Sequence, residues 1–372
     1  DRLDEAEASF RQAIALKPDY AKAHNNLGVT LQKIGKLDEA EACYKQAITL
    51  KSEYAEAHYN LANTLQELEK LDDAEANYTQ AIALKPDYDK AHNNLGATLQ
   101  KMGRLDEAEA CYSQAIALKP EFAEAHNNLG TTLKELDRID EAEASFSQAI
   151  ALKPEFAEAH NNLGVTLKEL DRIDEAEASH RQAIALKYDY AEAHYNLGNL
   201  LQDLNQFEEA EESYRQAISF KQNFALTHNN LGNTLKDLGR LKEAELSYKK
   251  ALVLKSDFVE AQNNLGNTLK TLGRLKEAEL SYKKALVLKP DFVEAHNDLG
   301  NTLKDLGRLK EAELSYKKAL VLKPDFVEAH NNKNFSLHYS AFCSPLFIYQ
   351  QHLEFEKQFG GLEVRTTLSL PV

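Results

Sequence analysis

Apolar and polar residues follow a helical period along most of this chain. In residues 21–54, apolar side chains first recur three or four positions apart: Ala23, Leu27, Leu31 and Ile34. Beyond Gly35, a second set with similar spacing follows: Leu37, Ala40, Tyr44, Ala47 and Ile48. This spacing places each set on one face of an α-helix. The segment therefore predicts two amphipathic helices joined by a short turn at the glycine.

The pattern returns every 34 residues. The segment Ala-His-Asn-Asn-Leu-Gly at 23–28 reappears with few changes in each successive unit up to 295–300, and a damaged copy lies at 329–334. A fixed period of this length is typical of a solenoid, in which one small unit is stacked many times and no single large core is needed. We therefore expect a binding surface, and no enzyme site, within the array.

Numbering each unit from Ala21 as position 1 divides the chain into three predicted segments. Residues 1–20 form a half unit that contains only the second helix. Residues 21–326 form nine complete units: 21–54, 55–88, 89–122, 123–156, 157–190, 191–224, 225–258, 259–292 and 293–326. Residues 327–372 form a degraded unit, a capping helix and a tail.

Several positions of the unit indicate how its helices start, pack and end. A glycine inside a helix costs about 1 kcal/mol relative to alanine, so the recurrence of glycine at position 8, as in Gly28, indicates a close approach of two helices. Proline at position 32, as in Pro86, ends the second helix because it cannot continue one. The segment Asp291-Phe-Val-Glu294 predicts a capping box for the next helix.

These residues match the pattern of a known repeat, and the matching positions are Leu27, Gly28, Leu31, Gly35, Ala40, Tyr44, Ala47 and Pro86. The chain resembles the tetratricopeptide repeat (TPR) family over residues 1–326. The resemblance implies an all-α fold, an α-solenoid in which helix-turn-helix units form a right-handed superhelix. The histidine at position 4 departs from the family pattern, as do four replacements of the turn glycine: Glu69, Asp137, Asp171 and Asn205.

Composition narrows the classes of partner. The formal net charge is −15, which argues against nucleic acid and anionic membrane surfaces because both require a basic face. The three cysteines form no Cys-x-x-Cys pair, which favours reduced thiols. The sequence contains no long apolar span and no visible signal peptide. We expect a cytoplasmic protein, and we interpret the start at Asp1, in mid-unit, as the start of a fragment.

Asparagine at position 6 of each unit is the main candidate for function. It lies on the first helix, away from the Leu27 and Leu31 face, and asparagine is a mediocre helix former, so its recurrence requires a reason. The set comprises Asn26, Asn60, Asn94, Asn128, Asn162, Asn196, Asn230 and Asn264, followed by Asp298 and Asn332.

Two explanations of this asparagine ladder stay open at the level of sequence. An amide both donates and accepts hydrogen bonds, so a row of them along a concave wall can hold the backbone of extended peptide segments of varied sequence. The alternative is a structural role, in which the amides bond adjacent repeats to each other, or simple persistence after duplication. Position 5 is also mostly asparagine, with Tyr59 and Tyr195 as exceptions.

Other polar residues give no catalytic or metal site. Histidine recurs at position 4, as in His24 and His58, but only once per unit and without an HxxxH pair or nearby cysteine ligands, so packing is the better explanation. We identify no phosphate loop, nucleophile elbow or paired catalytic carboxylates. We therefore expect no catalytic residues, no metal and no cofactor in this chain.

The second helices change along the chain. Early units read Leu-Asp-Glu-Ala-Glu-Ala, whereas units from 225 onward read Leu-Lys-Glu-Ala-Glu-Leu-Ser-Tyr-Lys-Lys, as at 275–284. The outer surface therefore shifts from acidic to mixed charge. A solvated face produced by recent duplication explains this shift, and a second contact surface selected by charge is the alternative.

The tail carries a second resemblance. Residues 332–339 and 348–359 are similar to the junction between repeats and catalytic domain in SPINDLY-type and O-GlcNAc transferase proteins. The resemblance implies an alternative function, in which this chain is the substrate-recognition arm of such an enzyme, with the catalytic domain absent. A divergent cap over the last repeat is the other explanation of the tail.

The favoured prediction is a protein–protein interaction scaffold. Its concave groove would hold proteins or peptides in extended conformation through Asn26 and its equivalents. Because Asp1 begins in mid-unit, the end repeats leave an apolar face uncovered, which predicts that the chain can self-associate.

Overall fold

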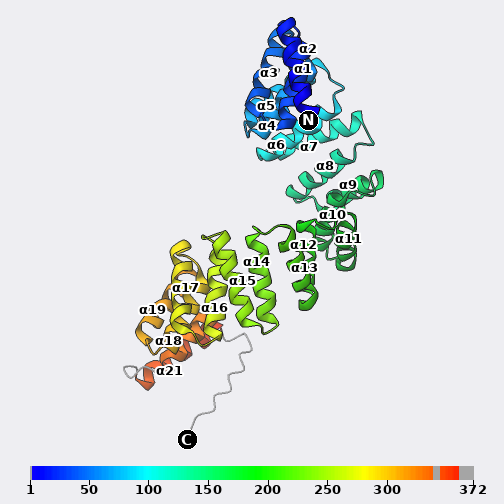
Figure 1. Ribbon diagram of the computed structural model, residues 1–372. Coiled ribbons are helices and arrows are strands. Elements are labelled where there is room, and N and C mark those ends of the chain that lie inside the picture. Colours follow the sequence, from blue (N-terminus) through cyan, green and yellow to red (C-terminus); the bar gives the residue numbers. More distant parts are fainter. Residues whose placement is uncertain (1, 338–343, 360–372) are drawn as a thin grey trace. The chain divides into compact units, whose positions relative to one another are not determined.

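The computed structural model describes residues 2–337 and 344–359, and every regular element within them is an α-helix. The predicted all-α fold of repeated helix pairs is confirmed (Figure 1). The first helices of the pairs are α2 (Ala21–Ile34), α4 (Ala55–Glu67), α6 (Asp89–Lys101), α8 (Ala123–Glu135), α10 (Ala157–Glu169), α12 (Ala191–Asp203), α14 (Ala225–Asp237), α16 (Val259–Thr271) and α18 (Val293–Asp305). The second helices are α3 (Leu37–Leu50), α5 (Leu71–Leu84), α7 (Leu105–Leu118), α9 (Ile139–Leu152), α11 (Ile173–Leu186), α13 (Phe207–Phe220), α15 (Leu241–Leu254), α17 (Leu275–Leu288) and α19 (Leu309–Leu322). Three helices flank these pairs: α1 (Arg2–Leu16), α20 (Val327–Leu337) and α21 (Pro345–Phe359).

The chain divides into two compact parts, Asp1–Tyr188 and Asp189–Val372. Within each part, every helix packs against its neighbours in sequence (Figure 1). The backbones of successive first helices also approach one another, whereas those of successive second helices stay farther apart. The first helices therefore line the inner side of each stack, and the second helices form its outer side.

The core of each unit is a layer of alanine, leucine and one ring. Ala40, Tyr44 and Ala47 of α3 are fully buried, and Leu27 and Leu31 of α2 cover them from the other helix. Burial of each leucine side chain stabilises the fold by about 1.5–3 kcal/mol. Equivalent residues repeat this layer in the following units.

The glycine at position 8 lies directly against the ring of the layer. A Cβ atom at Gly28 would lie 2.7 Å from Cε1 of Tyr44, closer than packed carbon atoms come. The same contact recurs in the other units that have glycine there, with Phe146 or His180 in place of the tyrosine in two of them. The predicted close approach of the two helices is confirmed. The ring at position 24 leaves no room for a Cβ atom at position 8.

The turn within each pair uses the left-handed backbone conformation at position 15. Gly35 has φ 84°, and glycine adopts this region without steric cost. Four units place a side chain there in the same conformation: Glu69 (φ 59°), Asp137 (φ 61°), Asp171 (φ 59°) and Asn205 (φ 58°). The turn geometry is therefore kept where the glycine is lost.

The predicted capping box at 291–294 is wrong. Helix α18 begins at Val293, so Phe292 and not Asp291 is the N-cap residue, and no side chain caps the helix. The helix start is fixed in another way. The carbonyl of Phe292 accepts from the backbone N–H of His296 at 3.2 Å, and the ring of His296 bonds the carbonyl of Pro290 at 2.9 Å. None of the described helices is long and apolar enough to cross a membrane.

Candidate functional site

The position-6 asparagines lie on the inner helices and form hydrogen bonds between units. In several units the side-chain amide nitrogen donates to the amide oxygen of the position-5 asparagine in the preceding unit. The donor–acceptor pairs are Asn60–Asn25 (3.0 Å), Asn128–Asn93 (3.1 Å), Asn162–Asn127 (3.1 Å), Asn264–Asn229 (3.2 Å) and Asn332–Asn297 (3.0 Å). The acceptor asparagines are buried, and the donors are partly exposed. The ladder therefore has the structural role that was the alternative at the level of sequence.

Where position 5 is tyrosine, the ladder uses other acceptors. Asn94 donates to Tyr59 Oη at 3.1 Å and to Asn63 Oδ1 at 2.9 Å. In the second compact part, Asn230 donates to Tyr195 and Asn199 in the same way, at 3.3 and 2.9 Å. Asparagine at position 9 thus serves as a second acceptor for the ladder, and Asn233 does the same for Asn264 at 3.2 Å in a unit with asparagine at position 5.

The bonds between units fix the orientation of each ladder amide. In Asn128 and Asn162 the bond uses one of the two amide N–H groups. The second N–H and the amide oxygen belong to a side chain that is partly exposed on the inner face. Asn26 and Asn196 occupy the equivalent places on α2 and α12.

Asp298 interrupts the ladder in the last complete unit. A carboxylate has no N–H, so it cannot donate to the preceding position-5 residue, and Asn263 Oδ1 is buried without a hydrogen-bond partner. Burial raises the pKa of Asp298 to about 6, although the Lys270 charge and the side chains of Asn267 and Asn263 act in the opposite direction. The contact between the units 259–292 and 293–326 therefore has both a buried acceptor without a partner and a poorly solvated carboxylate.

The position-4 histidines are structural, as expected. Where position 32 of the preceding unit is proline, the histidine Nε2 bonds the proline carbonyl at 2.9–3.1 Å; the pairs are His24–Pro18, His92–Pro86, His126–Pro120, His160–Pro154, His296–Pro290 and His330–Pro324. After Ser52, His58 bonds Asn77 instead, and after Gln222, His228 Nε2 is buried without a partner. Within residues 2–337 and 344–359, no group of histidine, cysteine and carboxylate side chains is placed to hold a metal ion.

A row of ion pairs on the outer side was not predicted from the sequence. A basic residue at position 16 reaches back to a glutamate at position 21 of the preceding unit, as in Arg138–Glu109 (2.7 Å) and Arg172–Glu143 (2.6 Å). The same arginines also bond a glutamate in their own unit, Glu141 or Glu175. Exposed pairs contribute about 0–1 kcal/mol each, but here they repeat along the stack. Glutamates of the early units, such as Glu109 and Glu143, thus join each unit to the next one.

The two described cysteines pack against the core. Cys43 and Cys111 are free thiols at the same unit position, partly buried beside the apolar layer. Burial raises the pKa of both thiols, that of Cys111 to about 11, which keeps them protonated and poorly nucleophilic. Cys343 lies outside the described residues, as do residues 338–342 and 360–372 of the tail.

Comparison with known proteins identifies the repeat. Profiles described as Tetratricopeptide repeat or TPR repeat match 1–35, 19–87, 89–122, 123–156, 145–178, 191–224, 232–273, 266–307 and 293–326. A search of curated proteins returned no match. The matched segments end at residue 326, so they give no support to the resemblance of the tail to SPINDLY-type and O-GlcNAc transferase proteins.

Solved structures with similar folds include the APC/C hetero-tetramer Cut9–Hcn1, which is 15% identical, with 89% of this chain and 81% of that chain aligned at a TM-score of 0.55. YrrB, described as a TPR protein with an unusual peptide-binding site, is 24% identical, with 50% and 97% aligned at 0.45. MamA is 28% identical, with 44% and 95% aligned at 0.40. The first of these shows a shared fold. With TPR profiles matched along residues 1–326 and the helix pairs of each unit in place, the chain belongs to the tetratricopeptide-repeat family.

Proposed function

We propose that this chain is a protein-interaction scaffold whose inner face holds extended peptide segments of partner proteins through the asparagine ladder. One observation carries the proposal: a partly exposed amide at position 6 recurs along the inner helices, held in one orientation by its bond to the preceding unit. The structural bond and the binding role are compatible, because one amide group takes part in several hydrogen bonds.

The bond between units favours binding by lowering its entropic cost. A free asparagine side chain loses rotamer freedom when it binds a ligand, whereas the ladder amides are already ordered by the fold. A peptide in extended conformation presents backbone N–H and C=O groups along its length, and a row of amides pairs with them whatever the side chains are. The inner face is therefore suited to several partners rather than to one sequence.

Two double variants separate binding from structure. N128A/N162A removes two ladder amides, whereas N93A/N127A removes only their buried acceptors and leaves both amides present. We expect N128A/N162A to weaken binding to a panel of unstructured fluorescent peptides by about tenfold, since each lost hydrogen bond contributes about 0.5–1.5 kcal/mol. Fluorescence anisotropy measures the affinity, and thermal unfolding of both variants monitors the fold.

The matched variant decides the interpretation. N93A/N127A should retain more peptide affinity than N128A/N162A at comparable loss of thermal stability. Equal loss of binding in both variants would show that the ladder acts only on the fold.

A further inference from the structure

The outer side of the second compact part carries a surface that the inner-face function does not use. Helices α15, α17 and α19 share the sequence Leu-Lys-Glu-Ala-Glu-Leu-Ser-Tyr-Lys-Lys-Ala-Leu-Val-Leu. Two apolar positions of this sequence point to solvent: Leu246, Leu280 and Leu314 at position 22, and Val253, Val287 and Val321 at position 29. These six side chains are 55–80% exposed, so the three helices present two rows of aliphatic residues to solvent.

A row of lysines lies between the two apolar rows. Lys250 is four residues after Leu246 and three before Val253, so the three side chains share one helical face. Lys284 and Lys318 take the same place on α17 and α19. We call the Leu246, Lys250 and Val253 positions of these three helices the outer stripe.

The lysines of the outer stripe have no carboxylate partner among the described residues, although their neighbours in sequence do. Lys249, Lys283 and Lys317 pair with glutamates four residues earlier in the same helix, at 2.6–2.7 Å. The adjacent Lys250, Lys284 and Lys318 are exposed and make no such pair within the described part of the chain. Three ammonium groups without a carboxylate are thus held between two exposed aliphatic rows.

The same positions have a different character in the earlier units. Position 26 is glutamine in α3 to α13, and position 22 is alanine in α3 to α11. The formal charge follows the same change: −3 in α5, α7, α9 and α13, −2 in α3 and α11, and +1 in α15, α17 and α19. The outer stripe is therefore a local basic and apolar surface on a chain whose net charge is −15.

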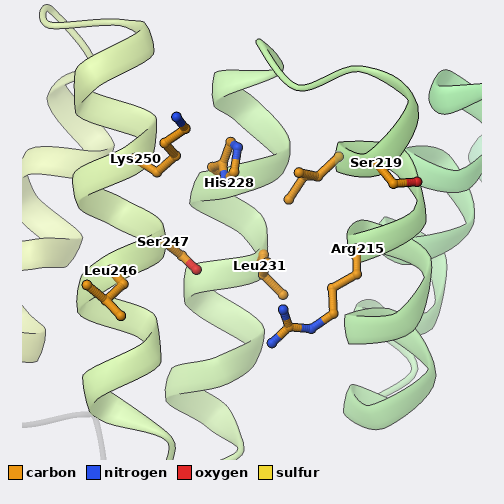
Figure 2. A pocket seen from close by; sticks show the side chains of 8 residues that line it. Arg215, Ser219, His228, Leu231, Leu246, Ser247 and Lys250 are labelled. Carbon is orange, nitrogen blue, oxygen red and sulfur yellow. The ribbon is translucent and has the colours of Figure 1, made fainter.

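A groove opens beside the stripe at its α15 end. It has a volume of about 370 Å³ and lies between α13 and α15, with α14 as its floor (Figure 2). Ile218, Leu231 and Leu246 give it an apolar lining, and Arg215 and Lys250 stand at its sides. The groove has room for one apolar side chain of a partner beside the Lys250 ammonium, whereas Arg215 is paired with Glu211 at 2.8 Å.

We propose that the outer stripe and this groove form a second docking surface, which binds an acidic amphipathic helix of a partner protein. Lys250, Lys284 and Lys318 take the same place on α15, α17 and α19, so they form a row that crosses these helices. Carboxylates repeated along one face of a partner helix that lies along this row can pair with the three lysines. Apolar residues on either side of them meet the leucine and valine rows.

Other occupants fit the surface less well. The acidic second helices of this chain, such as α5 and α7, carry Ala76 and Ala110 where the outer stripe has leucine, so a second copy offers the charge without the apolar contact. An anionic membrane would be repelled by the net charge of −15. The stripe also has no aromatic residue, which membrane-surface helices usually provide.

The test uses the full chain and a synthetic helical peptide of about three heptads, with glutamate at i, i+7 and i+14 and leucine at the flanking positions. K250Q/K284Q/K318Q installs the residue found at this position in the earlier units. We expect it to weaken peptide binding by about tenfold, a change of about 1.4 kcal/mol shared among three exposed charge pairs. K249Q/K283Q/K317Q changes the net charge equally but removes paired lysines, and it should have a smaller effect.

A second variant tests the apolar rows. L246A/L280A/L314A also installs a residue found in earlier units, and it should weaken binding by more than about tenfold, since each leucine buried in the complex contributes more than one ion pair. Equal effects of the two lysine triples, or unchanged binding in the leucine triple, would overturn the proposal. So would binding to phosphatidylserine vesicles in place of the peptide, or self-association lost in these variants. N128A/N162A should leave this binding unchanged, which separates the surface from the inner ladder.

Discussion

At the residue scale, single departures from the repeat show what each position does. Asp298 is the one member of the ladder that cannot donate, and the acceptor opposite it, Asn263 Oδ1, is left without a partner. His180 stands where most units have tyrosine, and it fills the same fully buried place against Gly164. Both residues are ionisable, so the stability lost at each of them depends on pH.

Restoring the ladder at Asp298 should stabilise the protein. The amide introduced by D298N can donate to Asn263, and the substitution removes a carboxylate whose burial raises its pKa from 3.8 to about 6. A folded-state pKa above the unfolded one means that the carboxylate destabilises the folded state as pH rises from about 4 to 6. We expect a gain on the order of 1–3 kcal/mol at pH 7, which becomes smaller below pH 4, where the carboxylate is protonated in both states.

Denaturant unfolding of D298N and the parent chain at pH 4, 5.5 and 7 measures this effect. N264D is the reverse control, because it should orphan Asn229 in the same way. An equal gain at all three pH values would contradict the role of the carboxylate.

His180 should make the first compact part sensitive to acid. Burial lowers the pKa of His180 from 6.5 to about 4, so the unfolded chain binds the proton more tightly than the folded one. Stability contributed by the neutral ring is full above pH 6.5 and is lost as pH falls toward 4, by on the order of 3 kcal/mol.

H180Y installs the ring of the other units and should remove this loss. Hydrogen exchange of α10 and α11 at pH 5 and pH 7 measures it locally. If the parent chain and H180Y lose protection equally at pH 5, His180 is not the cause.

At the scale of the element, the turn between the two helices of a unit is set by one backbone conformation. A Cβ atom at Gly35 would have no atom within 4 Å of it. Glycine is therefore favoured at this position only because φ is positive. Left-handed backbone costs a residue with a side chain about 1–2 kcal/mol, and asparagine and aspartate adopt it more readily than others. The turns at Glu69 and Asn205 therefore differ in strain although their φ angles are nearly the same.

Substitution with glycine at these turns should raise stability by an amount that depends on the residue replaced. E69G should add about 1 kcal/mol, and N205G should add less, because asparagine tolerates the conformation better. Thermal unfolding of the two variants gives the comparison, with G35A as the opposite change that should lower stability. Equal effects of E69G and N205G would show that the type of side chain does not set the strain of the turn.

At the scale of the whole molecule, stability is a sum of units and of the contacts between neighbours. No described helix packs against a helix of a distant unit. The bonds of the ladder, the histidines and the ion pairs join a unit to itself or to the next, as in Asn128–Asn93, His126–Pro120 and Arg138–Glu109. Damage to one unit should therefore stay local.

G232A tests this locality. A Cβ at this position would lie 2.6 Å from the Tyr248 ring, and the overpacking cost of about 1–3 kcal/mol exceeds the gain of about 1 kcal/mol from replacing a helical glycine. Ala62 occupies the same position opposite Tyr78, so the ring can shift and the net cost should be about 1 kcal/mol. Hydrogen exchange should rise in α13 to α16 and stay unchanged in α2 to α7. A uniform rise along the chain would contradict additive behaviour.

The helices, their pairing and the family follow from the order of residues alone, because a 34-residue period with apolar residues at helical spacing leaves few other ways to bury them. The close helix contact is also predictable, since a glycine that recurs inside a helix needs a steric cause such as the Tyr44 ring. The capping box was predicted wrongly because a local pattern cannot show that Phe292 ends the loop and that His296 bonds Pro290.

The partners of Asn128 and Arg138 emerge only in three dimensions. Residues about 30 positions apart meet only when units stack, because each unit is too short to bring them together by itself. Stacking determines which amides are joined and which carboxylates are paired between units.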